Sequence, residues 1–136
     1  LVASAAGLLG VPGLAVYSAA KHGVVGLAES VRQELRRAKS AGVGLTLVCP
    51  SFISTGMFDG VKPPLGSRWL EPDALAGAIV EAVREGRSRL NEPFLVKLIP
   101  WLKLLPAPLT DRLSDWLGLG RALEGFKGSR PGQRAG

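Results

Sequence analysis

The chain has 136 residues, of which 46% are hydrophobic, and this length and composition predict one globular domain with an ordinary core rather than a disordered chain. Its 17 basic and 11 acidic residues give a net charge of +6 but are scattered along the sequence, which argues against nucleic-acid binding. Because no run of eighteen apolar residues occurs, no membrane-spanning helix is expected.

The first third of the chain predicts a strand end, a loop and one long helix. Leu1–Ser4 is short and apolar, and the glycines and proline between residues 7 and 13 argue against a helix there. From Val16 to Ala38, apolar residues recur at helical spacing and charged residues fall largely on the other side, as in an amphipathic helix. Gly42 follows as a helix stop signal.

The middle of the chain completes an α/β pattern. Val43–Cys49 is apolar and uncharged, which predicts a buried strand that Pro50 ends. Its cysteine, Cys49, is the only one in the chain and cannot form an internal disulfide, and its place at the end of an apolar run predicts a buried, unreactive thiol. This fits a reducing, cytoplasmic compartment. Ser51–Leu70 has the composition of a long loop, and such loops are usually lids or binding segments. Glu71–Glu85 predicts a second helix, with a proline in its first turn.

The C-terminal region contains two apolar segments, Phe94–Leu105 and Leu109–Leu119, each with a tryptophan. Lysines interrupt the first segment, so it suits a helix that lies in a membrane interface. The alternative, which we favour, is that the segment packs on the core, covers a substrate pocket or meets another subunit. Gly125–Gly136, rich in glycine, arginine and proline, is expected to be a disordered tail.

Tyr17 and Lys21 are four residues apart at the start of the long helix, which places their side chains on one face. A cation close to a phenol favours the phenolate, so Tyr17 could exchange a proton with a carbonyl or alcohol oxygen while a hydride moves at the carbon. Ser4, in the turn after the first strand, could hydrogen-bond the same oxygen and orient it. Such a pair occurs often by chance, so its meaning depends on the surrounding sequence.

The surrounding sequence resembles the active-site segment of the short-chain dehydrogenase/reductase family. The matching stretches are Ala3–Gly7 and Tyr17–Gly23, and the family also places a serine before its catalytic tyrosine at the separation of Ser4 and Tyr17. The resemblance implies that Tyr17 is the acid/base, that Lys21 also binds the nicotinamide ribose, and that Ser4 orients the substrate. His22, next to Lys21, is expected to be a surface or core residue, because neighbouring helical side chains point in different directions.

A second match follows the predicted strand, where Cys49–Thr55 resembles the family's proline-led loop over the nicotinamide. By this resemblance Pro50 begins the cofactor loop, the backbone of Ile53 meets the carboxamide, and Thr55 contacts the amide or pyrophosphate. Ser51 replaces the glycine that is common in the family, which puts the backbone path of the loop in question.

A finer resemblance concerns the substrate. Residues 55–58 with Gly60, together with the Leu- and Pro-rich C-terminal region, look like the family branch that includes retinol and hydroxysteroid dehydrogenases. This resemblance implies a hydrophobic, lipid-like alcohol or ketone, with Met57 and Phe58 as substrate contacts or as plain packing residues. It also implies NAD or NADP as the cofactor, and no metal site is expected.

The resemblance implies that this chain is the C-terminal part of a Rossmann-type, doubly wound parallel sheet with a helical tail. Residues 1–92 would form the second half of that domain, residues 93–124 a helical lid or contact segment, and residues 125–136 the tail. The family's glycine-rich turn for the pyrophosphate is not in the sequence, because the early glycines belong to the loop before Tyr17. The complete enzyme is expected to be a homo-oligomer with the long helix at a subunit interface. The alternative is a non-catalytic fragment or interaction module.

Overall fold

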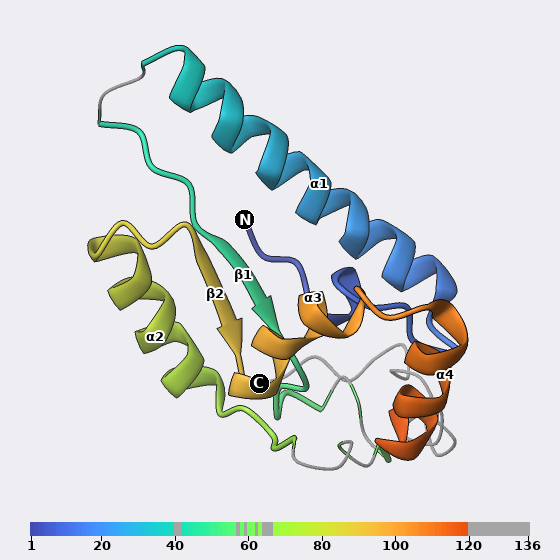
Figure 1. Cartoon of the computed structure of the whole chain (residues 1–136). Helices are drawn as coiled ribbons and strands as arrows, with labels where there is room; N and C mark the ends of the chain where they lie inside the picture. Colours follow the sequence, from blue (N-terminus) through green and yellow to red (C-terminus); the bar gives the residue numbers. More distant parts are fainter. Residues whose placement is uncertain (40–41, 57, 59, 62, 64–66, 120–136) are drawn as a thin grey trace.

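The computed structural model describes residues 1–39, 42–56, 58, 60–61, 63 and 67–119, and it shows an α/β protein (Figure 1). In chain order the elements are the 3₁₀ helix η1 (Ala5–Gly7), α1 (Ala15–Arg37), β1 (Leu47–Pro50), α2 (Pro72–Arg84), β2 (Arg89–Glu92), the 3₁₀ helix η2 (Phe94–Leu98), α3 (Ile99–Leu102) and α4 (Ala107–Trp116).

The strands are parallel, and β1 lies in the middle of them. Along one edge β1 pairs with β2, with Val48 opposite Leu90. Along the other edge Val2 forms a parallel bridge to Val48, supported by a hydrogen bond of 2.8 Å from the Ala3 amide to the Val48 carbonyl. The first residues therefore extend the sheet, as their apolar pattern predicted.

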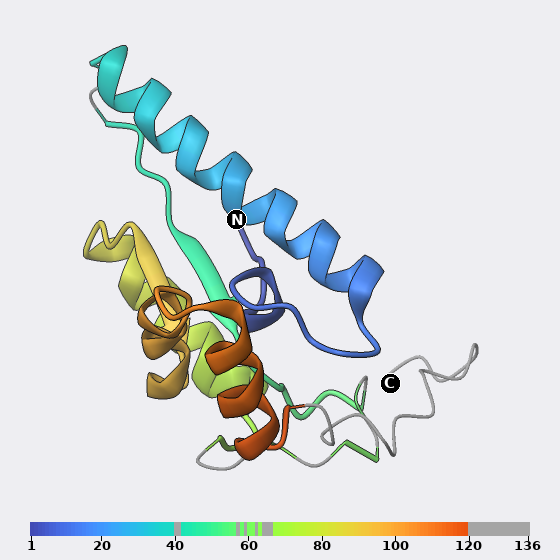
Figure 2. The same cartoon turned by 45° about the vertical axis from the view of Figure 1, so that its right-hand side comes forward.

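The core lies on both faces of β1, because successive side chains of a strand point to opposite sides. Leu47 and Cys49 belong to one buried cluster with Val25 and Ala28 of α1. Val48 packs on the other face in a cluster with residues of α2 and β2. Figures 1 and 2 show the resulting three layers, with α1 and α2 on opposite sides of the strands.

Both long helices were predicted to within two residues. α1 spans Ala15–Arg37 and ends with two arginines in its last turn, where positive side chains interact favourably with the helix dipole. α2 begins at Pro72, whose missing amide hydrogen has no partner in a first turn anyway. Gly86 follows α2 with a positive φ of 65°, as expected of a residue after a helix end.

The strand predictions need two corrections. The strand expected over Val43–Cys49 begins only at Leu47, because β2 starts opposite that residue and offers no partner before it. Val43 is 60% exposed instead. β2 itself was not predicted, since Arg-Leu-Asn-Glu contains a single apolar residue and has no strand pattern. Pairing with β1 and burial of Leu90 make it a strand.

The segment Phe94–Leu105 forms two short helices and a turn rather than one continuous helix. It packs on the core through Val96, which is buried in the same cluster as Leu47 and Cys49 of β1. Ile99 packs against that cluster. The same segment leaves Trp101 71% exposed. No helix in the described ranges is long and apolar enough to cross a membrane. The tail expected over residues 125–136 lies outside the described residues.

Candidate active site

Ser4 lies where the first strand segment ends and η1 begins, beside the end of β1. Its hydroxyl oxygen accepts a hydrogen bond of 3.2 Å from the Ala6 amide and so caps η1. The same hydroxyl donates to the Pro50 carbonyl over 3.4 Å, a long distance for a hydroxyl donor. Ser4 therefore lies at the carboxyl end of the parallel strands, where α/β proteins usually bind ligands.

Tyr17 and Lys21 occupy successive turns at the start of α1. The Lys21 ammonium nitrogen is 5.6 Å from the centre of the Tyr17 ring, within the range of a cation–π contact. It also donates a hydrogen bond of 3.4 Å to the carbonyl of Val2 in the neighbouring strand segment. This second contact directs the lysine toward the sheet, so its charge stays close to the tyrosine.

The start of α1 is held by the buried Ser18. Its hydroxyl accepts a hydrogen bond of 3.4 Å from the Val11 amide, which ties the loop before the helix to the helix itself. The Ser18 carbonyl lies 2.9 Å from Nδ1 of His22. His22 is therefore turned toward the backbone of its own helix, and it does not line the cavity described next.

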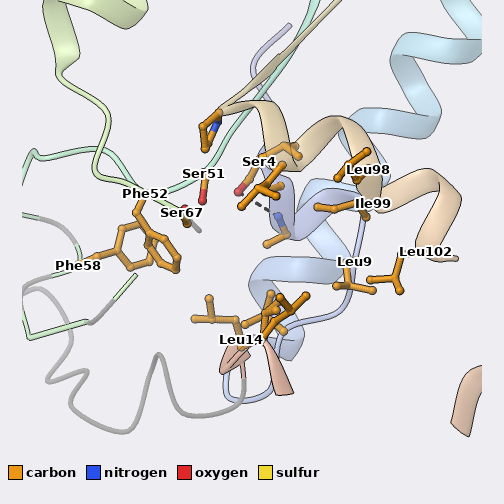
Figure 3. Close-up of a pocket in the computed structure, with 18 of the residues that line it drawn as sticks. Ser4, Leu9, Leu14, Ser51, Phe52, Phe58, Ser67, Leu98, Ile99 and Leu102 are labelled. Atoms are coloured by element: carbon orange, nitrogen blue, oxygen red, sulfur yellow. Dashed lines mark hydrogen bonds between the residues drawn. The ribbon is translucent and has the colours of Figure 1, made fainter. Parts of the chain in front are cut away.

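A cavity of about 340 Å³ opens beside Ser4 and Tyr17, a volume typical of small-molecule sites. Figure 3 shows Ser4, Ser51 and Ser67 between the aromatic pair Phe52 and Phe58 and a group of aliphatic side chains. The remaining wall is apolar and comes from the loop before α1 and from the C-terminal helices; it comprises Ala5, Ala6, Leu9, Val11, Leu14, Pro93, Leu95, Val96, Leu98, Ile99, Leu102, Leu113, Leu117 and Leu119.

Four aromatic rings form a continuous series along one side of the site. Phe58 contacts Tyr17 edge to face, with 6.5 Å between ring centres, and contacts Phe52 in the same way at 5.3 Å. Phe52 in turn meets Trp69 at 5.8 Å. Edge-to-face contacts of this kind add to the stability gained from burial. The series joins the tyrosine of α1 to the loop that follows β1.

Residues 53–55 of the loop after β1 lie outside the cavity wall, although other residues of the same loop line it. Ile53 forms a parallel bridge with Leu70, and its carbonyl accepts a hydrogen bond of 2.8 Å from the Thr55 amide. Ser51, at the position where the family commonly has glycine, donates its amide to the Glu92 carbonyl over 2.8 Å. That contact anchors the start of the loop to the end of β2.

The sequence-predicted residues thus divide into two groups. Ser4, Tyr17 and Phe58, which were assigned to substrate and catalysis, line the cavity. The residues assigned to the cofactor other than Tyr17 do not line it; these are Lys21, Pro50, Ile53 and Thr55. Met57 lies outside the described residues. The roles of all these residues remain predictions.

Cys49 lies under the site in β1 and is fully buried. Burial raises the pKa of the Cys49 thiol, because the thiolate would lose its hydration, and the nearby charge of Arg89 opposes this effect only in part. The thiol is therefore neutral at physiological pH. This matches the buried, unreactive cysteine expected from its place in an apolar strand.

Several cavity residues were not identified from the sequence. Phe52 and Ser67 come from the long loop, and the leucines at 98, 102, 113 and 117 come from the C-terminal helices. Each of the two leucine pairs has a spacing of four, which puts its members on one face of a helix. That spacing indicates that one face of each helix is buried, but it does not show which part of the protein covers that face. The spacing alone therefore could not show whether these leucines line a pocket or belong to the core.

Comparison with known proteins gives consistent results. Residues 1–65 match the family model described as short chain dehydrogenase. Epidermal retinol dehydrogenase 2 of Homo sapiens is 41% identical over 128 residues, which cover 92% of this chain and 41% of that protein. The Mus musculus protein of the same name is 37% identical over 132 residues, or 95% of this chain and 43% of that protein.

Retinol dehydrogenase 10 of Rattus norvegicus is 32% identical over 139 residues, which cover 95% of this chain and 39% of that protein. The chain therefore spans about two fifths of the length of the curated relatives that it matches.

Proposed function

This chain belongs to the short-chain dehydrogenase/reductase family, and we propose that it carries the catalytic groups of an NAD(P)-dependent oxidoreductase that interconverts an alcohol and a carbonyl. The observation that carries the proposal is the joint position of Ser4 and Tyr17 on one apolar cavity, with the Lys21 ammonium beside the tyrosine ring. The relatives named above are oxidoreductases of retinol by name.

In the reductive direction, the Tyr17 hydroxyl donates its proton to the substrate carbonyl oxygen as the carbon accepts a hydride. In the oxidative direction, the Tyr17 phenolate accepts the proton of the alcohol as the hydride leaves. Lys21 stabilises the phenolate through its charge. Ser4 hydrogen-bonds the substrate oxygen, and it gives up only a long bond to Pro50 to do so.

The nicotinamide, when bound, supplies or accepts the hydride. The residues of this chain fit one end of such a cofactor: Lys21 offers an ammonium beside Tyr17, and Ile53 and Thr55 lie in the loop at the carboxyl end of β1. We propose that residues outside this chain complete the site for the phosphates. The coverage of the relatives, about two fifths, supports this.

For the substrate, we propose a hydrophobic, retinol-like alcohol or the corresponding carbonyl compound. An apolar wall beside a few hydroxyl groups suits a ligand that is largely hydrocarbon with one oxygen. Phe58, for which the sequence indicated either a substrate contact or a packing role, lies on this wall.

The proposal is tested by replacing Tyr17, the only tyrosine in the chain, in the complete protein. Tyr17→Phe keeps the ring that packs on Phe58 and removes only the acid/base hydroxyl. We expect kcat for all-trans-retinol with NAD or NADP to fall by at least about a hundredfold, with retinol binding retained. Near-normal turnover would show that the assignment of Tyr17 is wrong.

The alternative is that the chain serves as a non-catalytic fragment or interaction module. The coding sequence upstream of Leu1 distinguishes the two functions. An in-frame extension of about a hundred codons with a glycine-rich strand-to-helix turn supports the enzyme. A stop codon directly upstream supports the module.

We also propose that the complete protein is a homo-oligomer that uses α1. Val16 and Leu27, on the helix surface, are 85% and 54% exposed, so both side chains are available for burial at a subunit contact. Light scattering of the complete protein tests this proposal. A strict monomer at micromolar concentration would contradict it.

A peripheral contact with the cytoplasmic face of a membrane is proposed for the C-terminal helices. Phe94, Trp101, Leu104 and Trp116 are each at least 66% exposed, and lysines lie among them. Tryptophan and lysine side chains are typical of membrane interfaces. Trp101→Ser is expected to reduce co-sedimentation with vesicles that contain anionic phospholipid, and equal binding of both proteins would contradict the contact.

A further inference from the structure

Ser67 lines the cavity, and none of the roles proposed above involves its hydroxyl group. Its oxygen is buried and has no hydrogen-bond partner. Nearly all buried hydroxyl groups in proteins are hydrogen-bonded, because an unpaired one has lost its hydration without compensation. Among the described residues, only one other buried side-chain oxygen or nitrogen is in this condition, that of Asn91, and Asn91 does not line the cavity.

The position of Ser67 is set by backbone contacts close to it. The Leu70 amide donates to the Phe52 carbonyl over 2.9 Å, and the Ser54 amide donates to the Leu70 carbonyl over 3.0 Å. Trp69 packs edge to face on Phe52. These contacts hold the end of the loop, which carries Ser67, against its beginning, which places Ser51 and Phe52 on the cavity.

The hydroxyl of Ser4, also on the cavity, differs from that of Ser67 because it is already hydrogen-bonded. Ser4 both accepts and donates a hydrogen bond, to Ala6 and Pro50. Ser67 makes none, so its hydroxyl can rotate toward a ligand without breaking a bond. Figure 3 shows Ser67 with Ser4 and Ser51 on one part of the cavity and aliphatic residues such as Leu98 and Leu102 on another. A ligand with a single oxygen has its best match at the serine part.

We propose that the Ser67 hydroxyl hydrogen-bonds the oxygen of the bound alcohol or carbonyl substrate and so selects its orientation. This inference rests on the proposed function and adds a polar substrate contact to it. Ser67 is a positioning residue: it takes no part in proton or hydride transfer, and it holds the oxygen-bearing end of a largely apolar molecule at the serine side of the cavity.

The test compares two probes that differ only at the oxygen. All-trans-retinol and the hydrocarbon in which a methyl group replaces its CH₂OH are bound to the complete protein, and binding is followed by quenching of tryptophan fluorescence. Ser67→Ala is expected to raise the Kd of retinol by about two- to tenfold and to leave the Kd of the hydrocarbon unchanged. Ser88→Ala, an exposed serine away from the cavity, is the matched control and should change neither.

Thermal unfolding separates this role from a structural one. Removing an unpaired buried hydroxyl is expected to leave the unliganded protein equally or more stable, because no bond is lost. Equal loss of affinity for both probes, or a lower Tm of Ser67→Ala, would overturn the proposal. The proposal would also be overturned if Ser67→Ala raised only the KM of the nucleotide. Selective loss of retinol binding in a protein without turnover would uphold Ser67 and count against the proposed function.

Discussion

The backbone of Gly7 in η1 lies directly against the backbone of Lys21 in α1. A Cβ atom added to Gly7 would be 2.6 Å from the Lys21 carbonyl oxygen, a distance that real Cβ atoms do not adopt. Glycine is therefore required here because two backbones approach closely. The contact fixes the turn that begins at Ser4 against the helical turn that carries Tyr17 and Lys21.

Gly7→Ala is expected to lower the free energy of unfolding by about 1–3 kcal/mol, because η1 and α1 must separate to admit the methyl group. Catalytic efficiency should fall with it, since Ser4 and Tyr17 move relative to each other. Gly10→Ala is the control, as a Cβ there meets nothing within 4 Å. Urea unfolding measures both variants, and equal stabilities would refute the proposed close contact.

Lys21 and His22 are neighbours with different surroundings, and their variants should differ accordingly. Lys21→Met removes the charge beside Tyr17 and is expected to lower kcat by about a hundredfold or more. His22→Gln should keep kcat within about twofold, because the His22 ring hydrogen-bonds the backbone of its own helix and lies off the cavity. Steady-state kinetics of the two variants decide the matter. A comparable loss in both would give His22 a role that its position does not explain.

Cys49 should make stability depend on alkaline pH. Burial raises its pKa in the folded state above the ordinary value of 9.0, so folding favours the neutral thiol. Below pH 9 the thiol is neutral in both states, and its contribution to stability is complete. As the pH rises above 9, the unfolded thiol ionises first, and the contribution is lost progressively up to the folded pKa.

The measurement for Cys49 is urea unfolding between pH 8 and 10.5, with Cys49→Ala as the control for lysine and tyrosine titration. The free energy of unfolding of the parent protein is expected to fall more steeply than that of the variant. Parallel curves would mean that the thiol is hydrated in the folded protein.

Leu102 and Leu104 offer a test of the cavity wall. Leu102 lines the cavity, whereas Leu104, two residues later, is 75% exposed. Leu102→Trp is expected to fill part of the space and raise the KM for retinol by about tenfold or more, with a smaller effect on a short-chain alcohol. Leu104→Trp should leave both values unchanged. If the two variants behave alike, the cavity does not hold the substrate.

The helices and the candidate catalytic pair could be predicted from the sequence because they depend on local patterns. The period of apolar residues predicted α1 and α2, and the spacing of four placed Tyr17 and Lys21 on one face. The sequence motif that includes Ser4, Tyr17 and Lys21 indicated the family. Each of these residues is common, but their combination with the surrounding sequence is specific. These features involve residues that are close together in the sequence.

The pocket and the last strand depended on contacts between distant residues. Arg89–Glu92 becomes β2 because β1 is beside it, and nothing in those four residues indicates a strand. The leucines of the C-terminal helices face Ser4 and Tyr17 only after the chain has folded back on itself. The role proposed for Ser67 could not be predicted from the sequence either, because the neighbouring residues do not reveal that its hydroxyl lacks a hydrogen-bond partner.

The sequence by itself determined the α/β class, the two long helices, the family and the identity of the candidate catalytic residues, because short-range periodicity and a specific motif encode them. Only the tertiary structure decided which side chains enclose the cavity, which buried hydroxyl on it has no hydrogen bond, and where the strands begin and end. Burial and strand pairing depend on which distant segments meet, and no local pattern contains that information.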